Sequence, residues 1–429
     1  MSRIFVRNFG PIHEADININ RLTLLIGEQA SGKSTLAKLV YFFKSLKEQL
    51  VGLALLDTPT ITASQLINVI RDQFYVFFGS TKRFPEGYRV EFHLGEGRSI
   101  TCAGSPLQVD INPQDWFNDL LGTVQNYTSR IGAARDRNDL GAEARERVAY
   151  HTALARLFLD PQENLYIPAS RNITVAYSAS FLAALREELR LKSDSLTPGK
   201  RNDAKAVDLI IARDFISHVQ QVRERFLGQG MEGFLQEMPP RMSELLIPRI
   251  QKLLKGQYRY TSNIGEHFHI PGRGNVLLEH ASSGQQESIR ILQDVLVSLS
   301  ENRNIFRIIE EPEAHLFPSG QRVLMEILAA LSASSTQSSL FITTHSPYIL
   351  SVINNLLYAA EVPDPAAVEA GFPDAIRLQR GTVSAYMITG DGVAQSMLDA
   401  ETGLIGANLI EDAWDEIDYA FQHLYTLDD

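Results

Sequence analysis

The chain has 429 residues, 44% of them hydrophobic and 21% charged, and its formal net charge is −11. No apolar run approaches the ~20 residues of a membrane-spanning helix, and a single cysteine excludes a disulfide framework or a cysteine-rich zinc site. The acidic balance argues against a protein that binds DNA over its whole surface, because phosphate binding requires lysine and arginine. We therefore expect a cytoplasmic protein with no membrane partner, built as one large domain with an inserted lobe or as two domains.

The first 170 residues predict strands and helices around a glycine-containing turn. An apolar run reaches Gly27, and the apolar face of the next segment predicts a helix from Ser34 to about Leu50. Between residues 81 and 110, short apolar stretches alternate with glycine and proline, which predicts a small antiparallel sheet. The first strand begins at Arg3, so no signal peptide is expected. The expected segments are strands 3–6, 15–19, 22–26, 88–94, 99–102 and 164–168, and helices 34–50, 114–130 and 141–159.

The remaining chain changes from a helical to an alternating pattern. Residues 175–255 are mainly helical, with an exposed loop at 195–203, and they lack the heptad repeat of a coiled-coil arm. After residue 257, strands alternate with helices, which predicts a parallel sheet, and an acidic amphipathic helix ends the chain. The predicted division is an α/β body in two parts, 1–170 and 257–429, with a compact helical lobe inserted at 171–256. The expected later segments are strands 258–262, 267–270, 275–281, 305–309, 339–343, 375–378 and 384–388, and helices 285–299, 320–332 and 347–357.

A phosphate-binding loop is the strongest signal. The segment 27–34 reads GEQASGKS, which matches the P-loop pattern, and it lies between a predicted strand and a predicted helix. Its glycines let backbone N–H groups face phosphate oxygens, while Lys33 reaches the β- and γ-phosphates and the Ser34 hydroxyl ligates Mg²⁺. We therefore predict ATP and Mg²⁺ as cofactors. The predicted nucleotide-binding residues here are Gly27, Glu28, Gln29, Ala30, Ser31, Gly32, Lys33, Ser34 and Thr35.

Two acidic residues and a histidine are the predicted catalytic partners of the P-loop. Glu310 and Glu311 follow the apolar strand 305–309, at the strand end where ligands of open α/β sheets bind. We predict that Glu310 holds Mg²⁺ together with Ser34, although most P-loop proteins place aspartate there. Glu311 would polarise the attacking water. His345 follows the next strand and would reach the γ-phosphate from the same edge.

A second candidate phosphate site precedes the helix predicted at 285–299. Ser282, Ser283, Gly284 and Gln285 place small residues before a helix N-terminus, which attracts anions. One chain already has a P-loop, so this segment would cap the γ-phosphate bound to a partner subunit. The alternative reading is an ordinary serine N-cap followed by a glycine turn.

In this order, the motifs resemble those of ABC-type ATPases, and more narrowly the soluble RecF/SMC/OLD-like branch. The segments 309–316 (IEEPEAHL) and 343–347 (TTHSP) resemble that branch, and 166–171 (YIPASR) resembles AAA-type ATPases of bacterial defence operons. The resemblance covers residues 3–45, 164–171 and 275–405. It implies an α/β fold, an ABC-type P-loop ATPase head with a mixed sheet, a small antiparallel β subdomain and an inserted helical lobe.

The resemblance also implies roles for single residues. Lys33, Glu311 and His345 would be catalytic, and Ser282 and Gly284 would act on the partner's ATP. Ser283 departs from transporter signatures, which carry glycine there. The residue usually called the Q-loop glutamine has no identifiable motif, and Gln162, just before the strand expected at 164–168, is the candidate for it.

The resulting hypothesis is a dimeric, Mg-dependent ATPase switch, a homodimer or higher homo-oligomer. It resembles the ATPase subunits of Septu or PARIS anti-phage systems, which implies a separate nuclease or toxin effector, since this chain shows no nuclease signature. The alternative is a RecF-like repair and recombination clamp that binds DNA. A transporter subunit is the weakest reading, because the chain carries a large helical insert.

Overall fold

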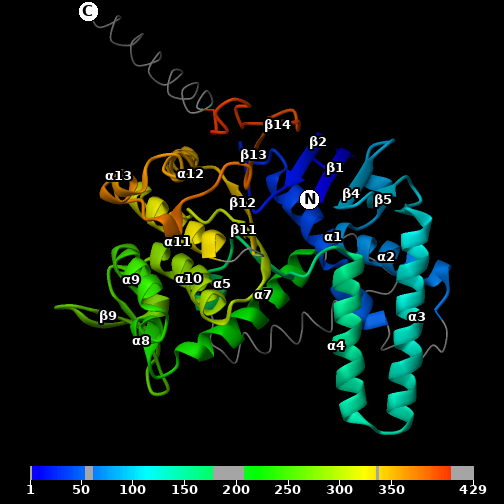
Figure 1. Ribbon diagram of the computed structural model, residues 1–429, viewed down its shortest axis with the longest axis horizontal. Coiled ribbons are helices and arrows are strands. Elements are labelled where there is room, and N and C mark those ends of the chain that lie inside the picture. The colour runs from blue at the N-terminus through cyan, green and yellow to red at the C-terminus, as the bar shows by residue number, and fades with distance from the viewer. Residues whose placement is uncertain (1, 54–60, 177–206, 335–337, 407–429) are drawn as a thin grey trace, which may run out of the picture.

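The computed structural model describes residues 2–53, 61–176, 207–334 and 338–406 (Figure 1). Its centre is a six-stranded mixed sheet with the order β14-β13-β3-β12-β11-β7, in which only β14 is antiparallel to its neighbour. The strands are β3 (Leu22–Gly27), β7 (Glu163–Ile167), β11 (Ile305–Glu310), β12 (Ser339–Thr344), β13 (Val383–Ile388) and β14 (Ala394–Ser396). The order shows that the carboxyl ends of five strands share one edge.

Helices cover both faces of this sheet, which explains why its central strands are mostly apolar and buried. Along β11, Phe306 and Ile308 pack in the cluster that contains α1, whereas Ile305 and Ile309 pack in the cluster that contains α10, α11 and α12. This alternation follows the two-residue period of a strand. The four helices are α1 (Lys33–Leu53), α10 (Ser283–Glu301), α11 (Pro318–Ser334) and α12 (Pro347–Tyr358).

The small antiparallel sheet is larger than expected. It has five strands in the order β2-β1-β4-β5-β6, so the first two strands of the chain pair with it and only β3 enters the central sheet. Helix α2 (Ala63–Phe78), which we did not anticipate, buries Phe74 and Phe77 in the core that it shares with this sheet. The strands are β1 (Ser2–Phe9), β2 (Ile12–Ile19), β4 (Arg89–Gly95), β5 (Arg98–Ala103) and β6 (Gln108–Asn112).

Two long helices form an antiparallel hairpin that projects from the body (Figure 1, cyan). They are α3 (Gln114–Asp136) and α4 (Leu140–Leu157), close to the two helices expected here. Tyr127 and Tyr150 stack across the seam, with ring centroids 4.0 Å apart. The Tyr150 hydroxyl also donates to the Leu50 carbonyl at 3.2 Å, which ties the hairpin to α1.

The region between β7 and β11 is helical and then forms a second small sheet. Its described helices are α5 (Ile173–Ala176), α7 (Val207–Arg223), α8 (Gly230–Gln236) and α9 (Pro240–Leu254). The antiparallel strands β8 (Gln257–Thr261), β9 (Gly265–Ile270) and β10 (Gly274–Leu277) follow. The loop expected at 195–203 lies outside the described residues.

Two expected strands differ from the structure. The strand expected at 375–378 is a 3₁₀ turn over Asp374–Ile376 whose N–H groups bond back to the turn, and its apolar residues are buried near α11 instead of in a sheet. The strand expected at 275–281 ends at Leu277, where Leu278–His280 forms another such turn. Helix α13 (Asp364–Glu369) precedes the first of these turns. The acidic helix expected at the end of the chain lies outside the described residues.

No helix in the described parts of the chain combines the length and the hydropathy that crossing a membrane requires. The α/β fold with a mixed central sheet and an antiparallel β subdomain is confirmed.

Candidate nucleotide site

The predicted site residues gather at the carboxyl edge of the central sheet. The P-loop follows β3, His345 follows β12, and Glu310 and Glu311 end β11. Because β12 lies between β3 and β11 in the sheet, the histidine is placed between the P-loop and the acidic pair.

Both P-loop glycines are required by close contacts. A Cβ atom on Gly27 would lie 2.3 Å from the Ile388 carbonyl oxygen, because β13 runs directly beside this turn. A Cβ atom on Gly32 would lie 2.9 Å from Ile12 Cγ1, and its φ of 111° is one that side chains disfavour. The loop therefore packs against two neighbouring strands, which fixes the backbone around the phosphate position.

Lys33 points into the loop that precedes it. Its Nζ donates to the carbonyl oxygens of Gly27 at 2.8 Å and Glu28 at 2.7 Å, and it lies 3.5 Å from His345 Nδ1. Burial lowers the pKa of Lys33, although the charge of Glu311 opposes this shift. A bound phosphate would stabilise the charged form of Lys33, because its negative charge would compensate for the hydration that the ammonium group loses by burial.

The three predicted catalytic side chains form a continuous chain of contacts. Lys33 meets His345 at its Nδ1 atom, and His345 Nε2 lies 3.3 Å from Glu311 Oε1. The Glu311 and His345 side chains stay about 40% exposed, so water has access to both. This geometry brings a cation, a ring with two nitrogen atoms and a carboxylate to one place.

Glu310 is held differently from Glu311. Its side chain is buried, and its two carboxylate oxygens accept hydrogen bonds from the Tyr166 hydroxyl at 2.8 Å and the Ala169 N–H at 3.2 Å. Burial, reinforced by the Glu310 charge, raises the pKa of Tyr166 far above its usual value, so the phenol stays a donor. One Glu310 contact comes from within β7 and the other from the residues just after it, and both belong to the YIPASR motif, which explains why this motif accompanies an acidic strand end.

The donor types fit a P-loop magnesium ion. A hydroxyl at the exposed Ser34 and a carboxylate at Glu310 are the hard oxygen ligands that Mg²⁺ prefers. Among the described residues no group of three or more His, Cys, Asp or Glu side chains could hold a metal. A magnesium ion that takes most of its ligands from phosphate and water does not need such a group.

Glu313 is a site residue that the sequence analysis missed. One carboxylate oxygen accepts from the Thr344 hydroxyl at 2.6 Å and from the His345 N–H at 2.8 Å. It therefore fixes the turn that presents the histidine. Because Glu313 lies only two residues after Glu311, the sequence could have indicated a third acidic residue at the carboxyl edge of the sheet.

The segment from Ser282 to Gln285 caps α10 and is exposed. The Ser282 hydroxyl accepts from the Gln285 N–H at 3.3 Å, and Gln285 Oε1 accepts from the Ser282 N–H at 3.0 Å, which is a capping box. A Cβ atom on Gly284 would lie 2.8 Å from the His315 carbonyl, so only glycine lets the helix approach the segment after the acidic pair. The serine N-cap reading is therefore correct as a description of this chain, and it leaves the Ser282 and Ser283 side chains facing outward.

Gln162 does not lie at this edge, and that candidate assignment is wrong. It precedes β7 and therefore sits at the amino ends of the parallel strands, where its Nε2 donates to Ser339 Oγ at 3.1 Å. The sequence placed it beside the correct strand but at the opposite end.

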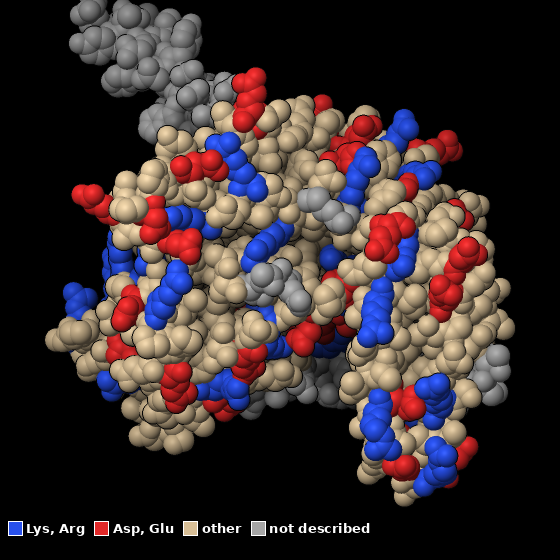
Figure 2. Space-filling view, in the orientation of Figure 1, with Lys and Arg blue, Asp and Glu red and all other residues tan. Residues whose placement is uncertain are grey.

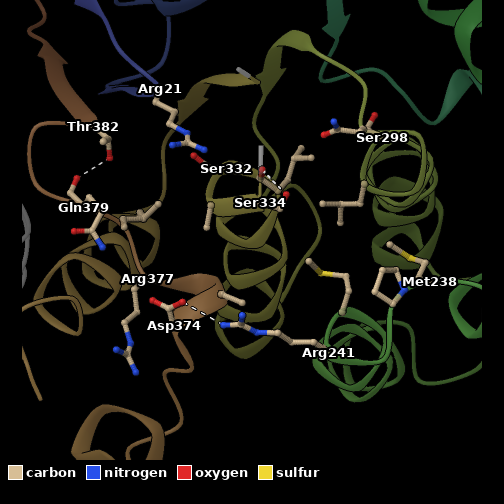
Figure 3. Close-up of a pocket in the computed structure, with 18 residues that line it drawn as sticks. Arg21, Met238, Arg241, Ser298, Ser332, Ser334, Asp374, Arg377, Gln379 and Thr382 are labelled. Carbon is tan, nitrogen blue, oxygen red and sulfur yellow. Dashed lines mark hydrogen bonds and ion pairs between the residues drawn. The ribbon is translucent and has the colours of Figure 1, made fainter. Parts of the chain in front are cut away.

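A cavity of about 430 Å³ also lies at the amino edge, away from the P-loop (Figure 3). It is lined by the residue before β3, the residue before β13 and the ends of α10 and α11, and an ion pair between Arg241 and Asp374 at 3.2 Å crosses its mouth. None of the predicted nucleotide residues lines it. In the predicted nucleotide site, Glu28, Gln29, Ala30 and Ser34 are exposed, whereas Ser31 and Lys33 are buried.

The fold and the site together define a class. A P-loop between β3 and α1, a pair of carboxylates at the end of a buried parallel strand and a histidine after the next strand are the parts of a P-loop ATPase site. The chain belongs to the AAA ATPase domain family, whose model matches residues 1–91 and 160–350. The match omits residues 92–159, which contain the hairpin α3–α4.

Individual relatives are distant. The chain is 24% identical over 374 residues to a protein named OLD nuclease from Thermus scotoductus (strain ATCC 700910 / SA-01), covering 82% of this chain and 60% of that protein. Among solved structures, it is similar to an SMC head bound to the C-winged helix domain of ScpA, with 12% identity, a TM-score of 0.43 and coverage of 93% and 97%. The SMC head domain from Thermotoga maritima gives 12% identity, a TM-score of 0.35 and coverage of 92% and 97%.

Proposed function

We propose that this chain is an ATP-gated dimeric switch. Two copies would enclose two ATP molecules head to tail, and Mg-dependent hydrolysis would reopen the pair. The proposal rests on the P-loop ATPase class and on the way the site residues divide between two surfaces of one chain.

That division is the observation that carries the proposal. Lys33, His345 and Glu311 contact one another within one chain, whereas the hydrogen bonds of Ser282 and Gln285 go to each other and to the Leu254 carbonyl. A helix N-terminus that faces outward offers partial positive charge to an anion. A second copy can bring an ATP γ-phosphate to it, and the open P-loop surface can receive the second copy's helix in return.

The chemistry follows from charge placement. Lys33 would neutralise the β- and γ-phosphates, and Glu311 would orient and polarise the attacking water. His345, between them, would contact the γ-phosphate from the β12 side. Mg²⁺, held by Ser34 and Glu310, would withdraw charge from the phosphate oxygens. All of these groups stabilise charge that develops in the transition state.

For the biological role we propose the ATPase component of an anti-phage defence complex that controls a separate nuclease or toxin. The named relative is a nuclease, and this chain spans 60% of its length. A RecF-like DNA clamp would need a continuous basic groove. On the hairpin, however, arginines pair with acids, as in Arg130–Glu146 at 3.6 Å and Arg135–Glu143 at 3.9 Å, and Figure 2 shows both signs of charge interspersed over the visible face.

A mixing experiment tests the shared site. Ser282→Arg blocks the outward helix end, and Lys33→Ala removes the phosphate-binding charge. In a mixed pair one site would carry both lesions and the other none, whereas each variant alone damages both sites. Mixing should restore ATPase activity toward half of the wild-type value per mixed pair. The readouts are phosphate release and, separately, ATP-dependent pairing of the two differently tagged chains.

Pairing without recovered activity would mean that the two sites turn over only together, and this outcome still supports a shared site. The control is a Ser243→Arg chain, which carries the same new charge on a half-buried serine of α9. If Ser282→Arg alone hydrolyses ATP like this control, the shared-site proposal is overturned.

A further inference from the structure

Arg171 lies at a junction of three segments that carry the site. It follows β7, and its side chain is 0% exposed. The sequence analysis noted it only as the last residue of the YIPASR motif. Arg171 is neither on the P-loop nor among the predicted catalytic residues, so its complete burial needs an explanation.

Its guanidinium bonds to the backbone of both site glutamates. Arg171 Nη1 donates to the Glu310 carbonyl at 2.9 Å, and Nη2 donates to the Glu311 carbonyl at 3.1 Å. The Nε atom turns to helix α10, where it meets the Glu287 carbonyl at 3.2 Å and the Glu287 carboxylate at 2.9 Å. The planar guanidinium group holds its N–H donors in fixed, different directions, so it can bond to carbonyl groups of separate segments at once. A lysine ammonium group could not hold all of these acceptors.

The Glu311 backbone needs such support. Its φ is 44°, a left-handed conformation that costs a non-glycine residue about 1–2 kcal/mol. The Glu311 N–H donates to the Thr343 carbonyl at 2.8 Å, and its carbonyl accepts from Arg171 and from the Ala314 N–H. Both ends of this strained peptide unit are therefore held, and Arg171 supplies the only one of these bonds that comes from a side chain.

The other end of the bridge is the helix with the outward cap. Glu287 lies five residues after Ser282, in the second turn of α10. The same helix is anchored by Arg290, which donates to Thr174 Oγ1 at 3.0 Å and pairs with Glu266 of β9. A shift of the α10 N-terminus would therefore pull on Arg171 and, through it, on the Glu311 backbone.

The ion pair is costly, which argues against a role in stability alone. Burial lowers the pKa of Arg171 and raises the pKa of Glu287, because desolvation disfavours both charged forms. Well-packed apolar side chains often replace such a pair without loss of stability. An apolar residue, however, could not donate hydrogen bonds to the carbonyl groups of Glu310, Glu311 and Glu287.

We propose that Arg171 is a positioning residue: it holds the water-polarising Glu311 in place and couples it to the α10 N-terminus. On the function proposed above, α10 meets the partner's ATP. A chain would then sense the partner's nucleotide through Ser282 and adjust its own Glu311 through Arg171.

The test compares two buried arginines. Arg307 is also 0% exposed and also joins β11 to α10, through Asp294, but it lies within β11, four residues before Glu311 and toward the amino end of the strand. We would measure ATP affinity, ATP-dependent pairing, single-turnover hydrolysis and Tm for Arg171→Lys and Arg307→Lys. Both should lower Tm, whereas only Arg171→Lys should slow hydrolysis, by about 100-fold, the loss that a displacement of about 1 Å at a reacting group produces.

ATP affinity should stay within about threefold of wild type in both variants, because neither arginine contacts the P-loop; a lost contact of the phosphates would cost at least tenfold. Glu287→Gln keeps the backbone acceptor and removes the carboxylate, so its hydrolysis should fall between wild type and Arg171→Lys. It also serves as the second variant if Arg171→Lys does not fold.

Equal slowing by Arg307→Lys and Arg171→Lys, or normal hydrolysis in both Arg171→Lys and Glu287→Gln, would overturn the positioning role. The test stands apart from the dimeric switch. If wild-type chains do not pair in ATP, the switch fails, while slowed hydrolysis in Arg171→Lys at unchanged ATP affinity would still establish that Arg171 positions Glu311.

Discussion

Replacing Glu311 by glutamine should stop hydrolysis while leaving the fold and ATP binding intact. The change removes the charge that polarises water and nearly preserves the shape of the side chain. Loss of a positioned base lowers the rate by about 10²–10⁴-fold, which corresponds to about 3–5 kcal/mol of barrier. We therefore expect single-turnover hydrolysis to fall within that range.

The structure predicts a much smaller effect on stability. The Glu311 side chain is 40% exposed, and its contact with His345 at 3.3 Å also lies near the surface. Pairs of this kind contribute about 0–1 kcal/mol, so the Tm should change little. ATP affinity should stay the same or rise, because a carboxylate near the γ-phosphate repels it. Closed pairs should therefore accumulate in ATP.

The assay is phosphate release from a single turnover, with pairing followed by size in the presence of ATP. Glu361→Gln is the matched control, since the Glu361 side chain is 43% exposed and pairs with Arg380 at 3.2 Å, far along the chain from the site. Hydrolysis by Glu311→Gln within tenfold of this control would refute the assignment and would direct attention to Glu310 or Glu313.

Two further outcomes follow from the structure. Lys33→Ala should weaken ATP binding by at least tenfold in an equilibrium titration, and unchanged affinity would contradict the P-loop assignment. Asp294→Ala should destabilise the fold by about 3–5 kcal/mol in denaturant, because it leaves Arg307 buried without its carboxylate. Burial alone would raise the pKa of Asp294, but Arg307 and His218 hold it well below its usual value. The folded-state pKa is depressed, so this stabilisation is complete above about pH 4 and is lost as the pH falls further. A variant as stable as wild type at pH 7 would contradict this account.

The parts of the site that lie in one short segment could be predicted from the sequence. The spacing of Gly27, Gly32 and Lys33 is fixed by a single turn, and the order of strands and helices places Glu311 and His345 at the same edge. Parallel strands have one direction, so a residue just after each strand arrives at the carboxyl edge whatever the details of packing.

The bridging role of Arg171 could not be predicted in this way. Its acceptors are mainly backbone carbonyls of Glu310, Glu311 and Glu287, and a carbonyl group has no residue type that a pattern could reveal. The wrong assignment of Gln162 has a different origin: it precedes β7, and once β7 is known to run parallel to β11, that order places it at the amino edge. The pairing of β1 with β4 likewise depends on a partner far away in sequence, whereas alternation reports only which face of a strand is buried.

The hairpin α3–α4 is long enough for a small rotation at its base to produce a large displacement at its tip. Its first helix has 23 residues, so it extends roughly 34 Å from its base. A rotation of about 10° at that base would move the tip by about 6 Å, because the displacement is proportional to the length of the helix, which rises about 1.5 Å per residue. Partway along α4, Tyr150 bonds to Leu50, which lies near the C-terminal end of α1, the helix that begins at Lys33. A tilt of α1 would therefore be passed to the hairpin, a part of the chain that the family match omits, and would grow toward the hairpin tip.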